Sequence, residues 1–132
     1  MSSLRKAARI AGAALALASL TGASAIDPVN PTCPLNPNWS NNPTMTLTVE
    51  KRGDMKVMLA EGRVDPGLPE RLAAALKANP DVGEIWLRSP GGDARAGNAA
   101  GRVIRSNLGV TTRIPAGWAC FSACNFVFMG GA

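Results

Sequence analysis

The chain has 132 residues, with 14 lysines and arginines, nine aspartates and glutamates, three cysteines and no histidine. This length allows one small domain and excludes two domains that each have their own core. A chain with no histidine and one close pair of cysteines is poorly suited to zinc, so we expect no metal and no cofactor.

Residues 1–25 have the three parts of a secretory signal peptide. Three basic residues precede position 10, residues 10–20 form an uncharged run rich in Ala and Leu, and Ala23-Ser24-Ala25 supplies small residues for cleavage. A permanent membrane-spanning helix needs about 20 apolar residues, roughly twice the length of this run. We therefore expect an exported protein, periplasmic or secreted, with no lasting membrane anchor.

Much of the positive charge lies in this leader. It holds three basic residues and no acidic one, so residues 26–132 keep 11 basic residues against nine acidic ones. Their arginines are spread among apolar and small residues instead of being clustered on one element. Nucleic-acid binding requires such a cluster, so we expect no nucleic-acid partner.

The three cysteines are Cys33, Cys120 and Cys124. In an oxidising compartment the simplest arrangement is one disulfide and one free thiol, and the sequence leaves three pairings open. Two cysteines four residues apart in a regular helix cannot form a bridge without distortion. The sequence thus favours a bridge from Cys33 to Cys120 or Cys124.

The first part of the exported chain predicts an arm followed by a hairpin. Residues 26–43 contain five prolines, which block helices and central strands, and predict an extended arm. Residues 44–50 alternate polar and apolar side chains, which is typical of a half-buried strand. The turn signal Arg52-Gly53-Asp54 separates them from a second strand at residues 55–60.

Strands and helices alternate along the rest of the chain. This order predicts βαβ units, a mostly parallel sheet and right-handed crossovers. Ligand sites form at the carboxyl ends of such strands, and the loops at residues 89–93 and 115–121 fit that position. The expected elements are a helix from about residue 66 to 78, a strand at 83–88, a helix at 94–108, a strand at 110–114 and a helix from Ser122.

Two short segments could carry chemistry. Gly91 and Gly92 lie between a strand and a helix, where bare backbone N–H groups could bind a phosphate or an oxyanion, although such a pair often only makes a tight turn. Ser122 lies where a loop meets an apolar helix. It could be a nucleophile, and it could equally be an N-cap, the commoner role of a serine at a helix start.

Taken together, the two loops resemble the Clp protease proteolytic subunit of the Clp-protease/crotonase-like superfamily. In that family a short apolar strand leads into a Ser-Pro-Gly-Gly loop, a helix, a strand and a turn that carries the nucleophile into a further helix. The matching segments here are Ile85-Trp86-Leu87-Arg88-Ser89-Pro90-Gly91-Gly92, Ala96-Gly97, residues 110–114 and residues 117–131.

The resemblance implies an α/β fold for residues 44–132, the N-terminal part of a Clp-protease/crotonase-like spiral. It implies that Ser122 is the nucleophile and that the backbone N–H groups of Gly92 and Ala123 form an oxyanion hole. Ser89, Pro90 and Gly91 would support this loop. The implied chemistry is serine hydrolysis of a peptide or protein substrate through an acyl-enzyme, with assembly into a homo-oligomer.

The catalytic base of that family has no counterpart in this sequence. The family's His and Asp follow the serine helix, whereas this chain has no His, and Lys51, Lys56 and Lys77 all precede the glycine loop outside any recognisable motif. We therefore expect a truncated, inactive piece of a hydrolase. The alternatives are a non-catalytic crotonase-like binding or assembly domain, and a remnant that does not fold stably.

Overall fold

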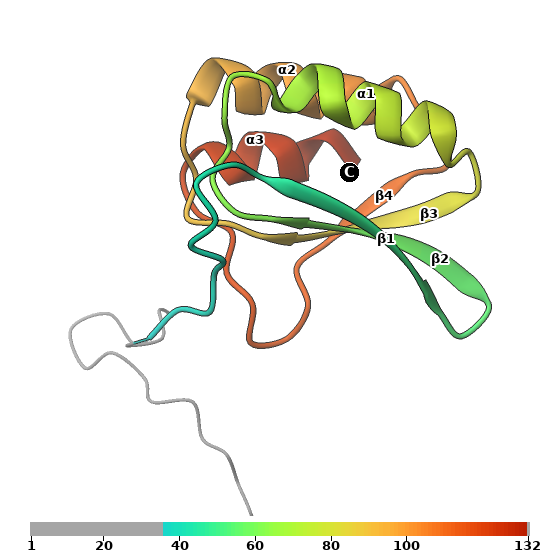
Figure 1. Cartoon of the computed structure of the whole chain (residues 1–132), viewed down its shortest axis with the longest axis horizontal. Coiled ribbons are helices and arrows are strands. Elements are labelled where there is room, and N and C mark those ends of the chain that lie inside the picture. Colours follow the sequence, from blue (N-terminus) through green and yellow to red (C-terminus); the bar gives the residue numbers. More distant parts are fainter. Residues whose placement is uncertain (1–35, 132) are drawn as a thin grey trace, which may run out of the picture.

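The computed structural model describes residues 36–131, so the predicted leader at residues 1–25 and Cys33 lie outside the described part. The described residues form one four-stranded sheet and three α-helices (Figure 1), which confirms the predicted α/β class. In chain order the elements are β1 (Thr46–Arg52), β2 (Met55–Glu61), α1 (Leu68–Ala78), β3 (Val82–Arg88), α2 (Ala94–Arg105), β4 (Thr111–Arg113), α3 (Ala123–Phe128) and the short 3-10 helix η1 (Met129–Gly131).

The sheet is mixed, with strand order β1-β2-β3-β4. β1 and β2 form the predicted antiparallel hairpin, turning at Gly53 with φ +60°. β2 pairs with β3, and β3 with β4, in parallel. The helix between β2 and β3 and the helix between β3 and β4 make the two crossovers that parallel neighbours require.

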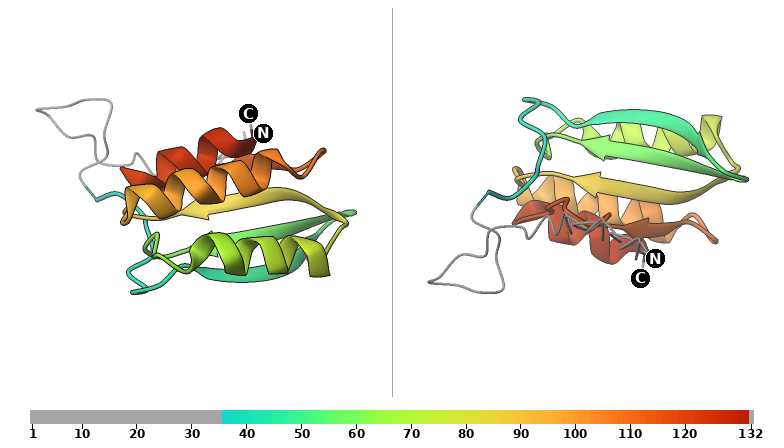
Figure 2. Two further views of the ribbon diagram at one scale, coloured as in Figure 1. Left: turned by 90° about the horizontal axis from the view of Figure 1, so that it is seen from above. Right: turned by 90° about the horizontal axis from the view of Figure 1, so that it is seen from below.

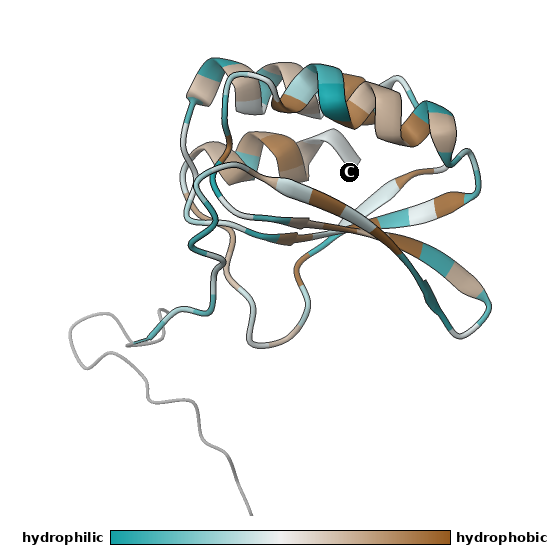
Figure 3. Ribbon diagram, viewed as in Figure 1, coloured by the Kyte–Doolittle hydropathy of each residue, from teal (hydrophilic) through white to brown (hydrophobic). Residues whose placement is uncertain are grey.

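All three helices lie on one face of this sheet (Figures 1 and 2). α1 covers the β1–β2 side, α2 covers β3, and α3 runs beside α2. α1 buries one leucine in every turn, at Leu68, Leu72 and Leu76, because positions four apart share a helix face. In Figure 3 the hydrophobic colour follows the middle of the sheet, where these side chains meet Ile85 and Leu87 of β3.

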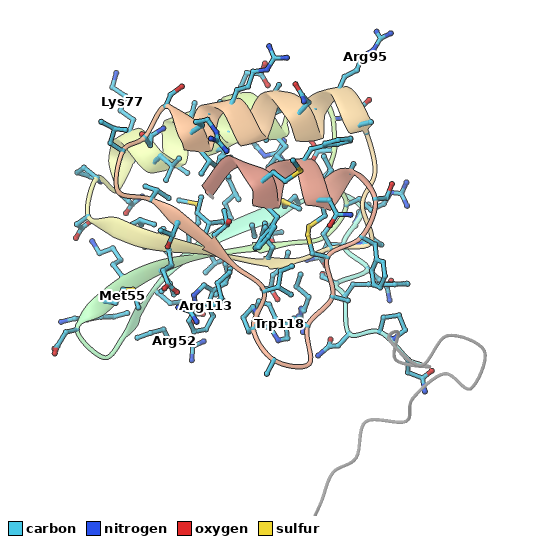
Figure 4. The ribbon with its side chains drawn as sticks, turned by 180° about the vertical axis from the view of Figure 1, so that it is seen from behind. Arg52, Met55, Lys77, Arg95, Arg113 and Trp118 are labelled. Atoms are coloured by element: carbon cyan, nitrogen blue, oxygen red, sulfur yellow. A yellow bond between two sulfur atoms is a disulfide. The ribbon has the colours of Figure 1, made fainter. Side chains whose placement is uncertain are left out.

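Arg52, Arg113 and Trp118 lie on the other face of the sheet (Figure 4), where Arg113 pairs with Glu84 of β3. The Trp86 and Trp118 rings meet edge to face, with centroids 6.3 Å apart. The Arg52 guanidinium lies 5.5 Å from the centre of the Trp86 ring. Trp86 is in register with buried Leu59 of β2, so the aromatic and charged layer covers an apolar strip.

The elements differ from the predicted ones mainly at their ends. α2 stops at Arg105, earlier than predicted, because the Asn107 side chain donates a hydrogen bond to the carbonyl of Val103 and Gly109 turns the chain with φ +88°. The serine-bearing segment enters α3 at Ala123, one residue after the predicted start. Within residues 36–131, no helix combines the length and apolarity needed to cross a bilayer.

Candidate active site

The two loops singled out in the sequence lie side by side at the carboxyl end of β3. Ser89 donates its backbone N–H to the carbonyl of Ala119 at 2.8 Å, and Phe121 donates to the carbonyl of Ser89 at 3.0 Å. These bonds form a short parallel bridge that extends the sheet beyond β4. The glycine loop (residues 89–93) and the serine turn (residues 119–123) are therefore joined by backbone hydrogen bonds, which do not depend on the identity of the side chains.

The glycine loop is held on its other side by Val64, a residue that the sequence did not single out. Val64 donates to the carbonyl of Gly91 at 2.9 Å and accepts from the N–H of Asp93 at 2.8 Å. Ser89, which is fully buried, accepts the N–H of Gly91 on its hydroxyl oxygen at 3.1 Å. This fixes the conformation of the loop while the N–H of Gly92 donates to no described residue.

Gly91 has a backbone conformation and a position that only glycine fits. Its φ is +96°, and a Cβ built on it would lie 2.7 Å from both the carbonyl oxygen of Phe121 and the Cβ of Ser122. The same Cβ would lie 3.1 Å from the backbone nitrogen of Ala123. Gly91 thus packs directly against the serine turn, and the loops predicted to meet do meet.

Ser122 is the sole residue other than glycine with positive φ among residues 36–131, at φ 51° and ψ −124°. It occupies the N-cap position of α3, yet its side chain makes no capping hydrogen bond, so the N-cap interpretation of the hydroxyl is wrong. The residue is exposed. Strained backbone at an exposed, uncapped serine is typical of functional sites, because a helix start does not require it.

The N–H of Ala123 is the second proposed oxyanion donor. Ala123 is the first residue of α3, so its N–H has no partner within that helix, and it donates to no other described residue. The N–H groups of Gly92 and Ala123 thus belong to segments in contact at the same end of the sheet, and neither N–H donates to another described residue, while Ala123 itself is only 1% exposed.

A disulfide joins Cys120 to Cys124 and closes a five-residue ring around Ser122. The predicted pairing with Cys33 is therefore wrong. That prediction assumed a regular helix through both cysteines, but Cys120 lies in the extended loop, and the sharp turn at Ser122 brings the two Cα atoms to 5.4 Å. This separation falls within the range that disulfides require.

Behind the serine, α2 and α3 are in backbone contact through glycines. A Cβ at Gly97 would lie 2.5 Å from the carbonyl oxygen of Ala123, and one at Gly101 would overlap the carbonyl oxygen of Phe126. The resemblance pointed to Gly97 but not to Gly101. The spacing of four residues was the available signal, because it places both glycines on one face of a helix.

Asp65 and Arg71 brace the segment that carries Val64. The Asp65 carboxylate accepts two hydrogen bonds from the Arg71 guanidinium and one each from the backbone N–H groups of Met45 and Gly67. These bonds, led by those from Arg71, lower the pKa of Asp65 from 3.8 to about 2. This carboxylate stays ionised at neutral pH and acts as a structural brace, because its oxygens already have partners.

No catalytic base lies at Ser122 among the described residues. The Ser122 hydroxyl has no hydrogen-bond partner there, and Asp93 uses its carboxylate to cap α2 by accepting the N–H of Ala96 at 2.8 Å. Lys56 is in register with Val82, at the opposite end of β3, and pairs with Asp81. Lys51 faces Lys56 in the hairpin, and Lys77 lies in the last turn of α1, before β3 begins.

Comparisons with protein-family models, with curated proteins and with solved structures find no match to this chain.

Proposed function

We propose that this chain is an exported Clp-protease-like serine hydrolase in which Ser122 forms an acyl-enzyme with peptide or protein substrates. The observation that carries the proposal is the exposed, uncapped Ser122 at φ 51°, packed against a glycine loop. The leader at residues 1–25 supports export. The order of strand, glycine loop, helix, strand and serine turn supports a fold of the Clp-protease/crotonase type.

In the proposed reaction the Ser122 hydroxyl oxygen attacks the substrate carbonyl. The N–H groups of Gly92 and Ala123 donate hydrogen bonds to the oxyanion that develops, and donors fixed in advance contribute on the order of 10²- to 10³-fold in rate each. The carbon–nitrogen bond then breaks, the amine leaves with a proton, and water hydrolyses the ester on Ser122.

Proton transfer from the Ser122 hydroxyl is the step with the least support, because no base lies beside Ser122 among residues 36–131. A serine hydroxyl without a neighbouring base ionises only at high pH, so the rate of attack should follow the hydroxide concentration. The chain by itself should react slowly at pH 7, and the rate should rise about tenfold per pH unit with no plateau near the pKa of histidine.

The second candidate function is a non-catalytic binding domain that uses the same N–H groups to hold a carboxylate, an acyl carbonyl or a phosphate. Within residues 36–131 no catalytic base lies at Ser122, and this favours the binding function, because binding needs the donors alone. It shares the fold and the export signal with the hydrolase and differs in requiring no attack by Ser122.

A fluorophosphonate probe separates the two candidates, because it reacts covalently with activated serines. We expect slow labelling of the purified chain that increases with pH and disappears in Ser122→Ala. Ser106→Ala is the matched control, since Ser106 is another exposed serine at a helix end. This variant should be labelled to the same extent as the unchanged chain. Absence of Ser122-dependent labelling up to about pH 10 would leave the binding function as the better description.

A further inference from the structure

We propose that the groove between α2 and α3 binds an acidic peptide segment that carries an apolar side chain. This interaction goes beyond the proposed hydrolase function and does not depend on the reactivity of Ser122.

The groove consists of two adjoining hollows of about 470 and about 170 Å³. Both are lined by Asn98 and Arg102 of α2 and by Phe126 of α3. The end of the groove at Ala94, the first residue of α2, is next to the candidate active site. Ala94 follows the glycine loop, and Phe126 lies one helical turn after Ser122. A segment bound along the groove would thus lie close to the serine turn.

The charge of the groove is one-sided. Arg95, Arg102 and Arg105 line it, all three are exposed, and none forms an ion pair with a described residue. α2 and α3 contain no Asp or Glu. By contrast, four arginines elsewhere pair with carboxylates, in the pairs Arg52–Glu50, Arg71–Asp65, Arg88–Glu61 and Arg113–Glu84. The arginines of the groove therefore have no acidic partner among the described residues. Acidic groups of a bound ligand would supply the missing partners.

Apolar side chains lie between these arginines. Phe126 is 42% exposed and Met129 is 60% exposed, and they lie three residues apart on one side of α3 and η1. A side chain of Leu or Phe size fits a hollow of about 470 Å³, and its burial against Phe126 would add to the charge attraction. Both hollows are shallow and open to solvent, so charge complementarity, more than shape, favours an acidic peptide as the occupant.

The test uses the purified full-length chain and two fluorescent twelve-residue peptides, one with glutamates around a single Phe and one with lysines in their place. We expect anisotropy titrations to show at least tenfold tighter binding of the glutamate peptide. This affinity should fall several-fold between about 50 and 500 mM salt because the contacts are exposed ion pairs. Replacing the Phe of the peptide by Ala should weaken binding further, and this arm needs no change in the protein.

The protein variant is Arg95→Glu with Arg102→Glu, which should lower the affinity at least tenfold. Lys77→Glu with Arg63→Glu is the control, because it changes the net charge equally at exposed positions outside the groove. Circular dichroism checks that each variant is folded. Equal binding of both peptides, or an equal loss in the control, would overturn the proposal. So would binding to phosphatidylglycerol vesicles without binding to the glutamate peptide, which would identify a membrane surface instead.

Discussion

The serine turn is stabilised differently from the face of the sheet opposite the three helices, which we call the open face. Around Ser122 many of the contacts are between backbone atoms, with Gly91, Gly97 and Gly101 allowing segments to touch where any side chain would collide. On the open face, long side chains form the contacts, such as the bidentate pair between Arg113 and Glu84 at 2.6 and 2.7 Å. Backbone contacts cannot adjust to an added atom, whereas exposed side chains can move aside, so the two regions should respond very differently to substitution.

The largest effect is expected for Gly91→Ala. The added methyl group would collide with Phe121 and Ser122 and would impose a positive φ on alanine, so we expect a loss of about 3 kcal/mol in the free energy of unfolding. Urea unfolding measures it. Gly117→Ala is the matched control, because Gly117 also has positive φ, at +82°, but open space around it. Its expected cost is about 1 kcal/mol, and equal costs at both sites would contradict the close packing described here.

Opening the disulfide should have the next largest effect. A five-residue ring corresponds to about 2 kcal/mol of loop-closure free energy, which reduction by a phosphine would remove. We expect fluorophosphonate labelling to slow as well, because the ring closes around Ser122. Cys33→Ala should keep the full response to reductant. If that variant loses the response, the bridge in solution involves Cys33 and the pairing described here is wrong.

Asp65→Asn should cost about 2 kcal/mol at pH 7, because it replaces an ionised acceptor of the Arg71 guanidinium. The folded-state pKa of Asp65, about 2, lies below its unfolded value of 3.8. Its stabilisation is therefore present above pH 4 and is lost as the pH falls through 2. In urea titrations the difference in the free energy of unfolding between wild type and variant should shrink over this range. A constant difference would show that the Asp65–Arg71 pair does not supply this stabilisation.

The smallest effect is expected on the open face. Arg113 is 56% exposed, so Arg113→Ala should cost no more than about 1 kcal/mol despite its good geometry. The Glu84 pKa, lowered to about 2 chiefly by hydrogen bonds from Arg113, should rise in the variant and can be followed by NMR titration. A cost above 2 kcal/mol would mean that this face behaves like a packed interior.

Much of the architecture could be predicted from local patterns. The alternating residues of β1, the apolar run of β3 and the stretch rich in Ala and Leu in α1 predict their elements. Asn79-Pro80 and Arg52-Gly53-Asp54 locate a helix end and a turn for steric reasons. The sequence also located the two loops at the carboxyl ends of neighbouring strands, which a parallel sheet brings to one edge.

The sequence alone therefore determined the order of the elements, the α/β class and the placing of Gly91 and Ser122 near one another. The tertiary structure decided that Ser122 is an exposed residue whose hydroxyl makes no capping bond, that Cys124 pairs with Cys120, and that Val64 holds the glycine loop. Local patterns report which residues are buried and where the chain turns. Backbone torsions and hydrogen bonds between distant segments arise only when the whole chain packs, so no short stretch of sequence encodes them.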